Sequence, residues 1–427
     1  MTKDASPSTR FAAWRLNPHT LGFTLLLAAL GTIPPFSIDM ALPALSQIGD
    51  SLQTQMGAVM LTLSFFMAGF SLAQLVFGPV SDHFGRWPTL VTGCSLFSAA
   101  SIACALAPSI EYLLLARFAA GCGAGAGMVM VFAMVRDLFE GIEARTKFSY
   151  VTLVLNLAPM IAPAAGVALL SLGDWRLIYW VLGAGGILLT LTILLGIQES
   201  LAEPDPSALR LSRLLGNYAR VMRHRLVIGY ILINGLSFAC MFAYVAGSSF
   251  VLIHLYGLSP AQYSLAFGGT ALSILVGSFI SGQLSRAKLP LHVPMLLGLS
   301  VGFAASVALM VMTLMGAHSL PVFYALLALA TFSYGLIAPN AAHGALHPMP
   351  EITGVAGASL GFVQMAGGSL ASALVAQLND GQTALSMTGV MALSAGLSLA
   401  IYAITVVPAE QEETTVHRPA TGSPAQQ

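Results

Sequence analysis

The chain has 427 residues, of which 56% are hydrophobic and only 8% are charged, and its mean hydropathy is +0.82. Because a globular protein carries about 25% charged residues, this chain cannot cover a water-facing surface, and we expect an integral membrane protein. Its 17 basic and 17 acidic residues cancel, so the basic bias of a nucleic-acid-binding protein is missing and no nucleic-acid partner is expected.

Runs of about 20 apolar residues predict twelve membrane-spanning helices. They cover approximately residues 21–44, 57–80, 88–108, 111–134, 148–172, 176–197, 226–249, 260–284, 291–316, 320–345, 353–377 and 384–407. The first run is too long for the apolar part of a signal peptide, so we expect it to be retained as a span. The four cysteines lie inside these runs without the spacing of metal ligands, and we predict no metal site and no cofactor.

Lysine and arginine positions predict the orientation, because cytoplasmic loops carry an excess of both. With the N-terminus inside, 15 of the 17 basic residues fall on the cytoplasmic side. They are Lys3, Arg10, Arg15, Arg86, Arg136, Arg145, Lys147, Arg210, Arg213, Arg220, Arg223, Arg225, Arg286, Lys288 and Arg418. The exceptions are Arg117 inside the fourth span and Arg176 at the outer start of the sixth, so we predict both termini in the cytoplasm.

The longest internal connection, 198–225, divides the chain into two halves of six spans, 20–197 and 226–407. Tails 1–19 and 408–427 flank them, and we expect both to be cytoplasmic and the second to be disordered. The connection is rich in arginine, and we expect its basic amphipathic piece to lie on the anionic leaflet. Two six-span halves predict a transporter built from repeats, with its site between the halves.

The connection between spans two and three, residues 78–86, reads GPVSDHFGR. We expect a tight turn at the membrane face, with Gly78 and Gly85 permitting the reversal of the chain. Two interpretations are open. The segment is either a plain hairpin with an inside-facing Arg86, or a gating turn in which Asp82 and Arg86 act together.

Five stretches resemble a known family. Residues 78–86 resemble the G-x-x-x-D-x-x-G-R signature of the major facilitator superfamily, and Arg117, Gly121 and Gly125 are similar to the R-x-x-x-G motif of its drug exporters. Ala158, Pro159, Pro163 and Gly166 resemble the antiporter motif of the fifth span. Residues 38–43 and 135–137 resemble the bicyclomycin/chloramphenicol-resistance (Bcr/CflA) drug:proton antiporters.

The resemblance covers the first half, whereas the second half matches by topology only. It departs from the family pattern at Ala158, where glycine is usual, and at Trp87, where a second basic residue is common. It implies an all-α membrane protein with twelve transmembrane helices in two pseudo-symmetric six-helix bundles (the major facilitator fold), in the bacterial cell inner membrane.

Asp39 is the only acidic residue well inside a predicted span, where a charge costs about 3 kcal/mol or more and usually serves function. Arg117 lies at a similar predicted depth in the fourth span, so the two can pair. They form either a static salt bridge or a proton-linked switch. Burial favours the neutral acid form of Asp39, whereas the nearby Arg117 favours the carboxylate, so small movements are expected to bind or release the proton. We therefore assign proton coupling to Asp39 and Arg117.

Two further groups are expected to control the conformational change. The proposed inner gate consists of Gly78, Asp82, Gly85, Arg86, Arg136 and Asp137, whose charges can lock one state and release another. The antiporter motif, Pro159, Pro163 and Gly166, predicts a bent helix, and the resemblance implies that this bend seals the cytoplasmic or central end between the halves.

Substrate-binding candidates come from spans expected to line a cavity. They are Phe36, Phe65, Phe66, Asn156, Asn234, Phe238, Met241, Tyr244 and Gln364. Taken singly, most of them fit helix packing better than ligand contact. Aromatic and methionine-rich surfaces nevertheless suit varied apolar ligands.

These features predict a monomeric secondary transporter in the lipid bilayer that exports small amphipathic drugs or toxic metabolites in exchange for protons. The alternative is a proton-coupled exporter or importer of one endogenous metabolite. An intramembrane enzyme would need an H-E-x-x-H pair or paired acids, and neither is present in the sequence. A channel would need a repeated filter loop, which two six-span halves do not suggest.

Overall fold

The computed structural model describes residues 16–317 and 319–409, so most of the two predicted tails lies outside the described residues. Every regular element in the described part is helical. Twelve of its helical segments are long and apolar enough to cross a membrane, which confirms the predicted number and places of the spans.

The first half contains six spans. They are α2 (Leu21–Asp39) with its extensions η1 (Leu42–Ala44) and α3 (Leu45–Ser51), α4 (Met56–Phe84), α5 (Arg86–Ala105), α6 (Ile110–Leu138), α7 (Gly141–Leu172) and α8 (Arg176–Gly196). Hydroxyl caps fix two of the starts: Thr20 Oγ1 accepts from the Phe23 amide before α2, and Ser109 Oγ accepts from the Tyr112 amide before α6.

The second half repeats this pattern after the linker helix α9 (Leu211–Arg223). Its spans are α10 (Arg225–Ser249) with η2 (Phe250–Leu255), α11 (Pro260–Arg286), α12 (His292–Leu314), α13 (Leu320–Leu346), α14 (Thr353–Gln377) preceded by η3 (Pro350–Ile352), and α15 (Leu385–Ile401) with η4 (Tyr402–Val406). Helix α11 begins with a capping box, in which Ser259 and Gln262 satisfy each other's amides.

Corresponding helices pack in the same way in the two halves. A Cβ at Gly121 of α6 would run into the Phe66 carbonyl oxygen of α4, so these two helices meet backbone to backbone. The same contact recurs in the second half, where Gly335 of α13 lies against the Ile274 carbonyl oxygen of α11. Spans two and four thus correspond to spans eight and ten, as the pseudo-symmetry of the two bundles requires.

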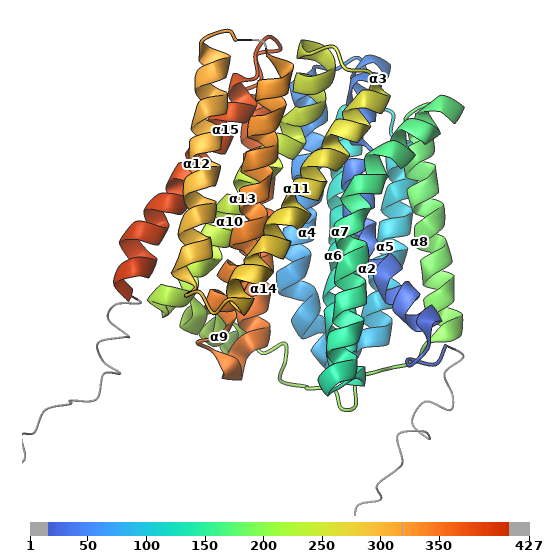
Figure 1. Cartoon of the computed structure of the whole chain (residues 1–427). Helices are drawn as coiled ribbons and strands as arrows, with labels where there is room; N and C mark the ends of the chain where they lie inside the picture. The colour runs from blue at the N-terminus through green and yellow to red at the C-terminus, as the bar shows by residue number, and fades with distance from the viewer. Residues whose placement is uncertain (1–15, 318, 410–427) are drawn as a thin grey trace, which may run out of the picture.

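The two halves meet mainly along α4 with α14 and α7 with α11 (Figure 1). We call the end of the molecule that carries α9 the linker end, and the opposite end, which carries α3, the far end. Three hydrogen bonds join the halves within the described residues, and all three lie toward the far end. They link Ser46 Oγ with His254 Nε2 (2.6 Å), Ser369 Oγ with the Ser64 carbonyl (2.8 Å), and Asn379 Nδ2 with Met60 Sδ (3.6 Å).

The predicted turn over residues 78–86 is wrong, because the reversal of the chain is much shorter than predicted. Helix α4 continues through Pro79 to Phe84, and Gly85 alone reverses the chain, with φ at +107°. A proline removes one backbone hydrogen bond, which a packed membrane helix tolerates. Gly78 makes no close approach, since a Cβ there would meet no atom within 4 Å. Gly85 is required, because its φ favours glycine and a Cβ would collide with the Glu199 carboxylate.

Candidate functional site

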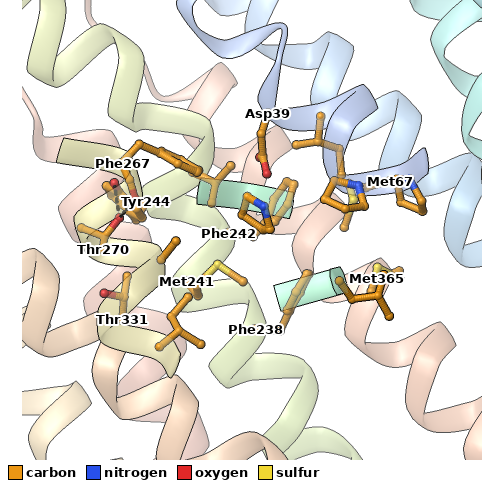
Figure 2. Close-up of a pocket in the computed structure, with 18 of the residues that line it drawn as sticks. Asp39, Met67, Phe238, Met241, Phe242, Tyr244, Phe267, Thr270, Thr331 and Met365 are labelled. Carbon is orange, nitrogen blue, oxygen red and sulfur yellow. Dashed lines mark hydrogen bonds between the residues drawn. The ribbon is translucent and has the colours of Figure 1, made fainter. Parts of the chain in front are cut away.

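A cavity of about 230 Å³ lies between the two halves (Figure 2). Helices α2, α4, α6 and α7 form one wall, and α10, α11, α13 and α14 form the other. Nine of the 21 lining residues are aromatic or methionine and nine more are aliphatic, proline or glycine, so the polar groups are Asp39 and the hydroxyls of Tyr244, Thr270 and Thr331. The Tyr244 hydroxyl and Thr270 Oγ1 are hydrogen-bonded to each other at 2.8 Å, so part of this polarity is satisfied internally.

Asp39 is the one charged residue among the side chains described as lining this cavity. It is the last residue of α2, it is 5% exposed, and its carboxylate points into the cavity (Figure 2). Pro34 and Pro35 lie one turn earlier on the same wall and interrupt the hydrogen bonding of α2. The cavity is therefore an apolar chamber with a single carboxylate.

Arg117 is buried inside the first bundle and does not pair with Asp39 in the described structure. Its Nη1 donates to Ser37 Oγ at 2.8 Å, and its Nε points to the Thr62 carbonyl at 3.4 Å. Its guanidinium lies 4.4 Å from the centre of the Phe66 ring. Ser37 and Asp39 are two residues apart, or about 200° around a helix, so they face opposite sides of α2. The predicted pairing of Arg117 with Asp39 is therefore absent from the described structure, and Arg117 bonds to Ser37 and Thr62 instead.

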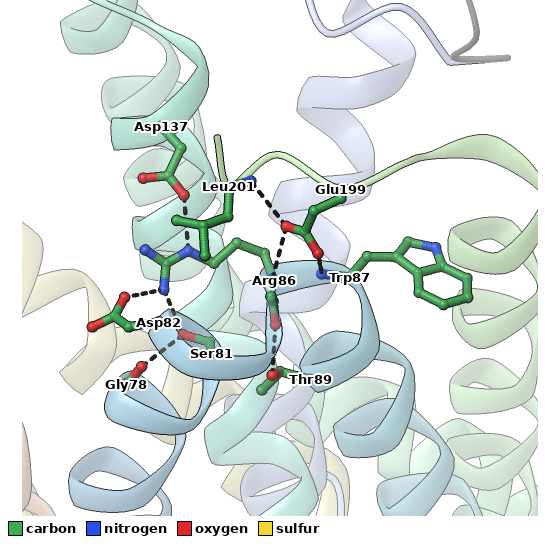
Figure 3. A network of polar contacts seen from close by, with 10 residues as sticks. Gly78, Ser81, Asp82, Arg86, Trp87, Thr89, Asp137, Glu199 and Leu201 are labelled. Atoms are coloured by element: carbon green, nitrogen blue, oxygen red, sulfur yellow. Dashed lines mark hydrogen bonds and ion pairs between the residues drawn. The ribbon is translucent and has the colours of Figure 1, made fainter. Parts of the chain in front are cut away.

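The charges at the linker end form a network around Arg86 (Figure 3). Arg86 Nη1 donates to Asp82 Oδ1 and to Ser81 Oγ, both at 2.5 Å, and its Nε donates to Asp137 Oδ2 at 2.8 Å. Because Asp82 and Ser81 end α4, Arg86 begins α5 and Asp137 ends α6, one guanidinium fastens three helices together. Arg136 is outside this network, and its exposed side chain extends toward Gly354 of α14 in the other half.

Glu199, which the sequence analysis did not single out, completes the network. Its Oε1 accepts from the Arg86 amide at 2.9 Å and its Oε2 from the Trp87 amide at 3.1 Å, so the carboxylate caps the start of α5 (Figure 3). A negative charge at a helix N-terminus is stabilising. The only signal in the sequence was an acid directly after the sixth span.

Replacing Glu199 with glutamine is expected to loosen the start of α5. The loss of the charged cap costs about 1 kcal/mol, so amide hydrogen exchange at Arg86 and Trp87 should accelerate about fivefold. Exchange mass spectrometry measures this. Glu203→Gln, in the exposed linker, is the matched control. Equal acceleration in the two variants would contradict the capping role.

The antiporter-motif residues divide between two environments. Pro159 lines the cavity, and Pro163 is buried. Gly166 lies against the backbone carbonyl of Met40, the residue directly after α2, within its own half and toward the far end. The implied seal between the halves therefore does not include Gly166, which instead sets the distance between α7 and the segment that follows Asp39.

Gly166→Ala is expected to lower the stability of the folded protein. The new Cβ would meet the backbone of Met40, which cannot move aside as a flexible side chain does, and such overpacking costs about 1–3 kcal/mol. Thermal unfolding of the purified protein measures the loss. Gly185→Ala in α8 is the control, because a Cβ there meets no atom within 4 Å. Equal melting temperatures for the two variants would refute the contact.

Three of the predicted substrate-binding residues, Phe238, Met241 and Tyr244, line the cavity. The other six, Phe36, Phe65, Phe66, Asn156, Asn234 and Gln364, do not line it. Phe66 packs under the Arg117 guanidinium, Asn156 is exposed, and Asn234 donates to Gln364, which in turn donates to Tyr334. Sequence reasoning missed Phe70, Phe242, Phe267, Met67 and Met365, because helices that are apolar all round do not reveal which face meets a cavity.

Two six-helix bundles around a central cavity with one carboxylate define a secondary transporter. The family model of the Major Facilitator Superfamily matches residues 25–372, and the chain belongs to that superfamily. It is therefore a transport protein rather than an enzyme, and a multi-pass inner-membrane protein.

Known relatives agree with this assignment. The chain is 35% identical to the uncharacterized MFS-type transporter YdgK of Bacillus subtilis, over 90% of this chain and 96% of that one. It is 28% identical to the bicyclomycin resistance protein homolog of Haemophilus influenzae, over 84% and 90%. These relatives confirm the predicted resemblance to the Bcr/CflA type. A solved structure of a bacterial homolog of the human lysosomal transporter Spinster has the same fold, with a TM-score of 0.68, 16% identity and coverage of 96% of this chain and 100% of that one.

Proposed function

We propose that this protein exports small amphipathic compounds, drugs among them, in exchange for protons. The observation that carries the proposal is the cavity itself, an apolar and aromatic chamber between the halves in which Asp39 is the single charge among the described lining residues. Such walls suit varied apolar ligands, and a lone carboxylate can bind either a proton or a polar group of the substrate. The resistance named for the Haemophilus relative supports a drug as one class of substrate.

We propose alternating access as the mechanism, with bundles 20–197 and 226–407 as the moving units and 198–225 as their connection. The cross-half hydrogen bonds close the far end, so a second state must break them and close the linker end. Arg117 holds α2 through its hydrogen bond to Ser37, and this contact on the face opposite Asp39 positions the Asp39 side chain toward the cavity. The Arg86 network and Arg136 occupy the end that must close.

The linker end is proposed to face the cytoplasm, with both termini on that side, since it carries most of the basic residues. The protein is proposed to act as a monomer, because each chain contains both halves of the cavity. Labelling of single cysteines at Asp50 and Arg145 by a membrane-impermeant reagent tests the orientation. Intact cells should label the first position and spare the second, and the reverse pattern would overturn it.

Transport by the purified protein in liposomes with an imposed pH gradient tests the function. The proposal expects several chemically unrelated amphipathic compounds to move against the direction of proton flow and to compete with one another. Movement in the same direction as protons would contradict the antiport. Failure of every compound in the panel to move would contradict the substrate class.

A second candidate is proton-coupled export or import of one endogenous metabolite. The cavity volume favours it, since about 230 Å³ is below the roughly 300–1,000 Å³ of pockets for drug-sized ligands. The same liposomes separate the two functions, because a specific transporter should respond to one metabolite and ignore the unrelated drugs.

A further inference from the structure

The linker helix α9 has three distinct faces. Val221 is fully buried in the apolar cluster of the second half, and its neighbours Leu214 and Tyr218 on that face are half-buried. Leu215 and Met222 are 59% and 60% exposed and lie about 20° apart around the helix axis. This second face is apolar and remains mostly exposed in the described structure.

The third face of α9 is basic. Arg223 lies about 90° around the helix from the exposed apolar stripe and Arg220 about 150° from it, and both are exposed. Arg220 makes an ion pair with Glu351 at 3.1 Å, but both side chains remain mostly exposed, so the guanidinium keeps access to solvent. An apolar stripe that adjoins a basic face is typical of helices that lie in a membrane surface.

The charge at the linker end differs between the two halves. In the part of the second half that the structure describes with α9, the basic residues at this end are Arg210, Arg220, Arg223, Arg225, Arg286 and Lys288, and the acidic residue is Glu351. In the described part of the first half, the basic residues are Arg86, Arg136, Arg145 and Lys147, against the acids Asp82, Asp137, Glu140, Glu143 and Glu199. The linker acids Glu203 and Asp205 belong to the same side, because the Asp205 amide donates to the Asp82 carbonyl at 2.8 Å. Among the described residues, the net positive charge at the linker end therefore lies on the half that carries α9.

We propose that α9 is a docking surface for anionic phospholipid headgroups. Leu215 and Met222 would enter the boundary of the acyl chains, while Arg223 contacts the lipid phosphates and Arg220 adds to the positive field around them. The position of α9 supports this occupant, because the helix ends directly before Arg225, where the spanning helix α10 begins (Figure 1). The leaflet surface would thereby hold the second half, while the acid-rich first half is free to tilt against it.

Lipid retention tests this proposal without relying on transport. The protein is purified in detergent with equal amounts of phosphatidylglycerol and phosphatidylethanolamine, and the retained lipids are quantified by mass spectrometry. The wild type should be enriched in phosphatidylglycerol. Arg223→Gln, which leaves the Arg220–Glu351 pair intact, should lower the enrichment by about fivefold, the effect of one basic residue at an anionic surface. Met222→Ser should lower it as well, because the apolar stripe contributes to binding.

Arg145→Gln is the matched control, since it removes an exposed charge at the same end of the acid-rich half. Its enrichment should equal that of the wild type. Equal losses in Arg145→Gln and Arg223→Gln would overturn the proposal in favour of a general charge effect, and unchanged enrichment in Arg223→Gln would overturn it directly. Displacement of the lipid by soluble glycerol phosphate at the same concentration would overturn it in favour of a free-anion site.

Discussion

Replacing Asp39 with asparagine is expected to abolish substrate accumulation driven by a pH gradient. Asparagine keeps the size of the side chain but cannot carry a proton between the two sides of the membrane. One pH unit across the membrane is worth about 1.4 kcal/mol per proton, or a tenfold concentration ratio of substrate, and the variant should lose all of it. Its accumulation ratio in liposomes should therefore fall to one.

Exchange of labelled for unlabelled substrate without a gradient should persist in Asp39→Asn, because the rest of the cavity wall is unchanged. Asp50→Asn is the control, since Asp50 is an exposed acid farther along the same span. That variant should accumulate substrate like the wild type. If Asp39→Asn still built a tenfold ratio, a different group would have to carry the proton.

The sequence was sufficient for the spans but not for the faces of the helices. Apolar runs mark a membrane helix by length alone, so all twelve were found. A helix such as α10 is apolar on every side, so the sequence could not tell that Phe242 meets the cavity while Asn234 bonds to Gln364. For the same reason the sequence did not reveal the partner of Arg117 on α2, which is Ser37 on the face opposite Asp39.

Contacts between segments distant in sequence could not be predicted from the sequence either. Glu199 caps a helix that begins 113 residues earlier, and no local spacing relates the two positions. The extent of α4 was missed for a different reason, because Gly78 and Pro79 resemble a turn in water but are tolerated in a packed membrane helix. The local residue pattern therefore predicted a turn at a place where packing against neighbouring helices keeps α4 helical.

Arg86→Gln is expected to stop most transport by loosening the linker end. The substitution removes the donor to Asp137, whose side chain is only 17% exposed, and an unpaired charged acceptor of this kind costs about 1.5–3 kcal/mol. An energy of that size is enough to shift a two-state balance about tenfold or more. Initial export rates should fall by a similar factor, while Arg145→Gln should retain the wild-type rate.

Double variants identify which partner of Arg86 matters. Asp137→Asn should recover part of the stability lost in Arg86→Gln, because it removes the charge left without its partner. Asp82→Asn should recover little, since the Asp82 side chain is 48% exposed and water already solvates it. Melting temperatures of the four proteins in each cycle give the two coupling energies. A larger coupling to Asp82 than to Asp137 would show that the exposed pair, rather than the link between α5 and α6, holds this end together.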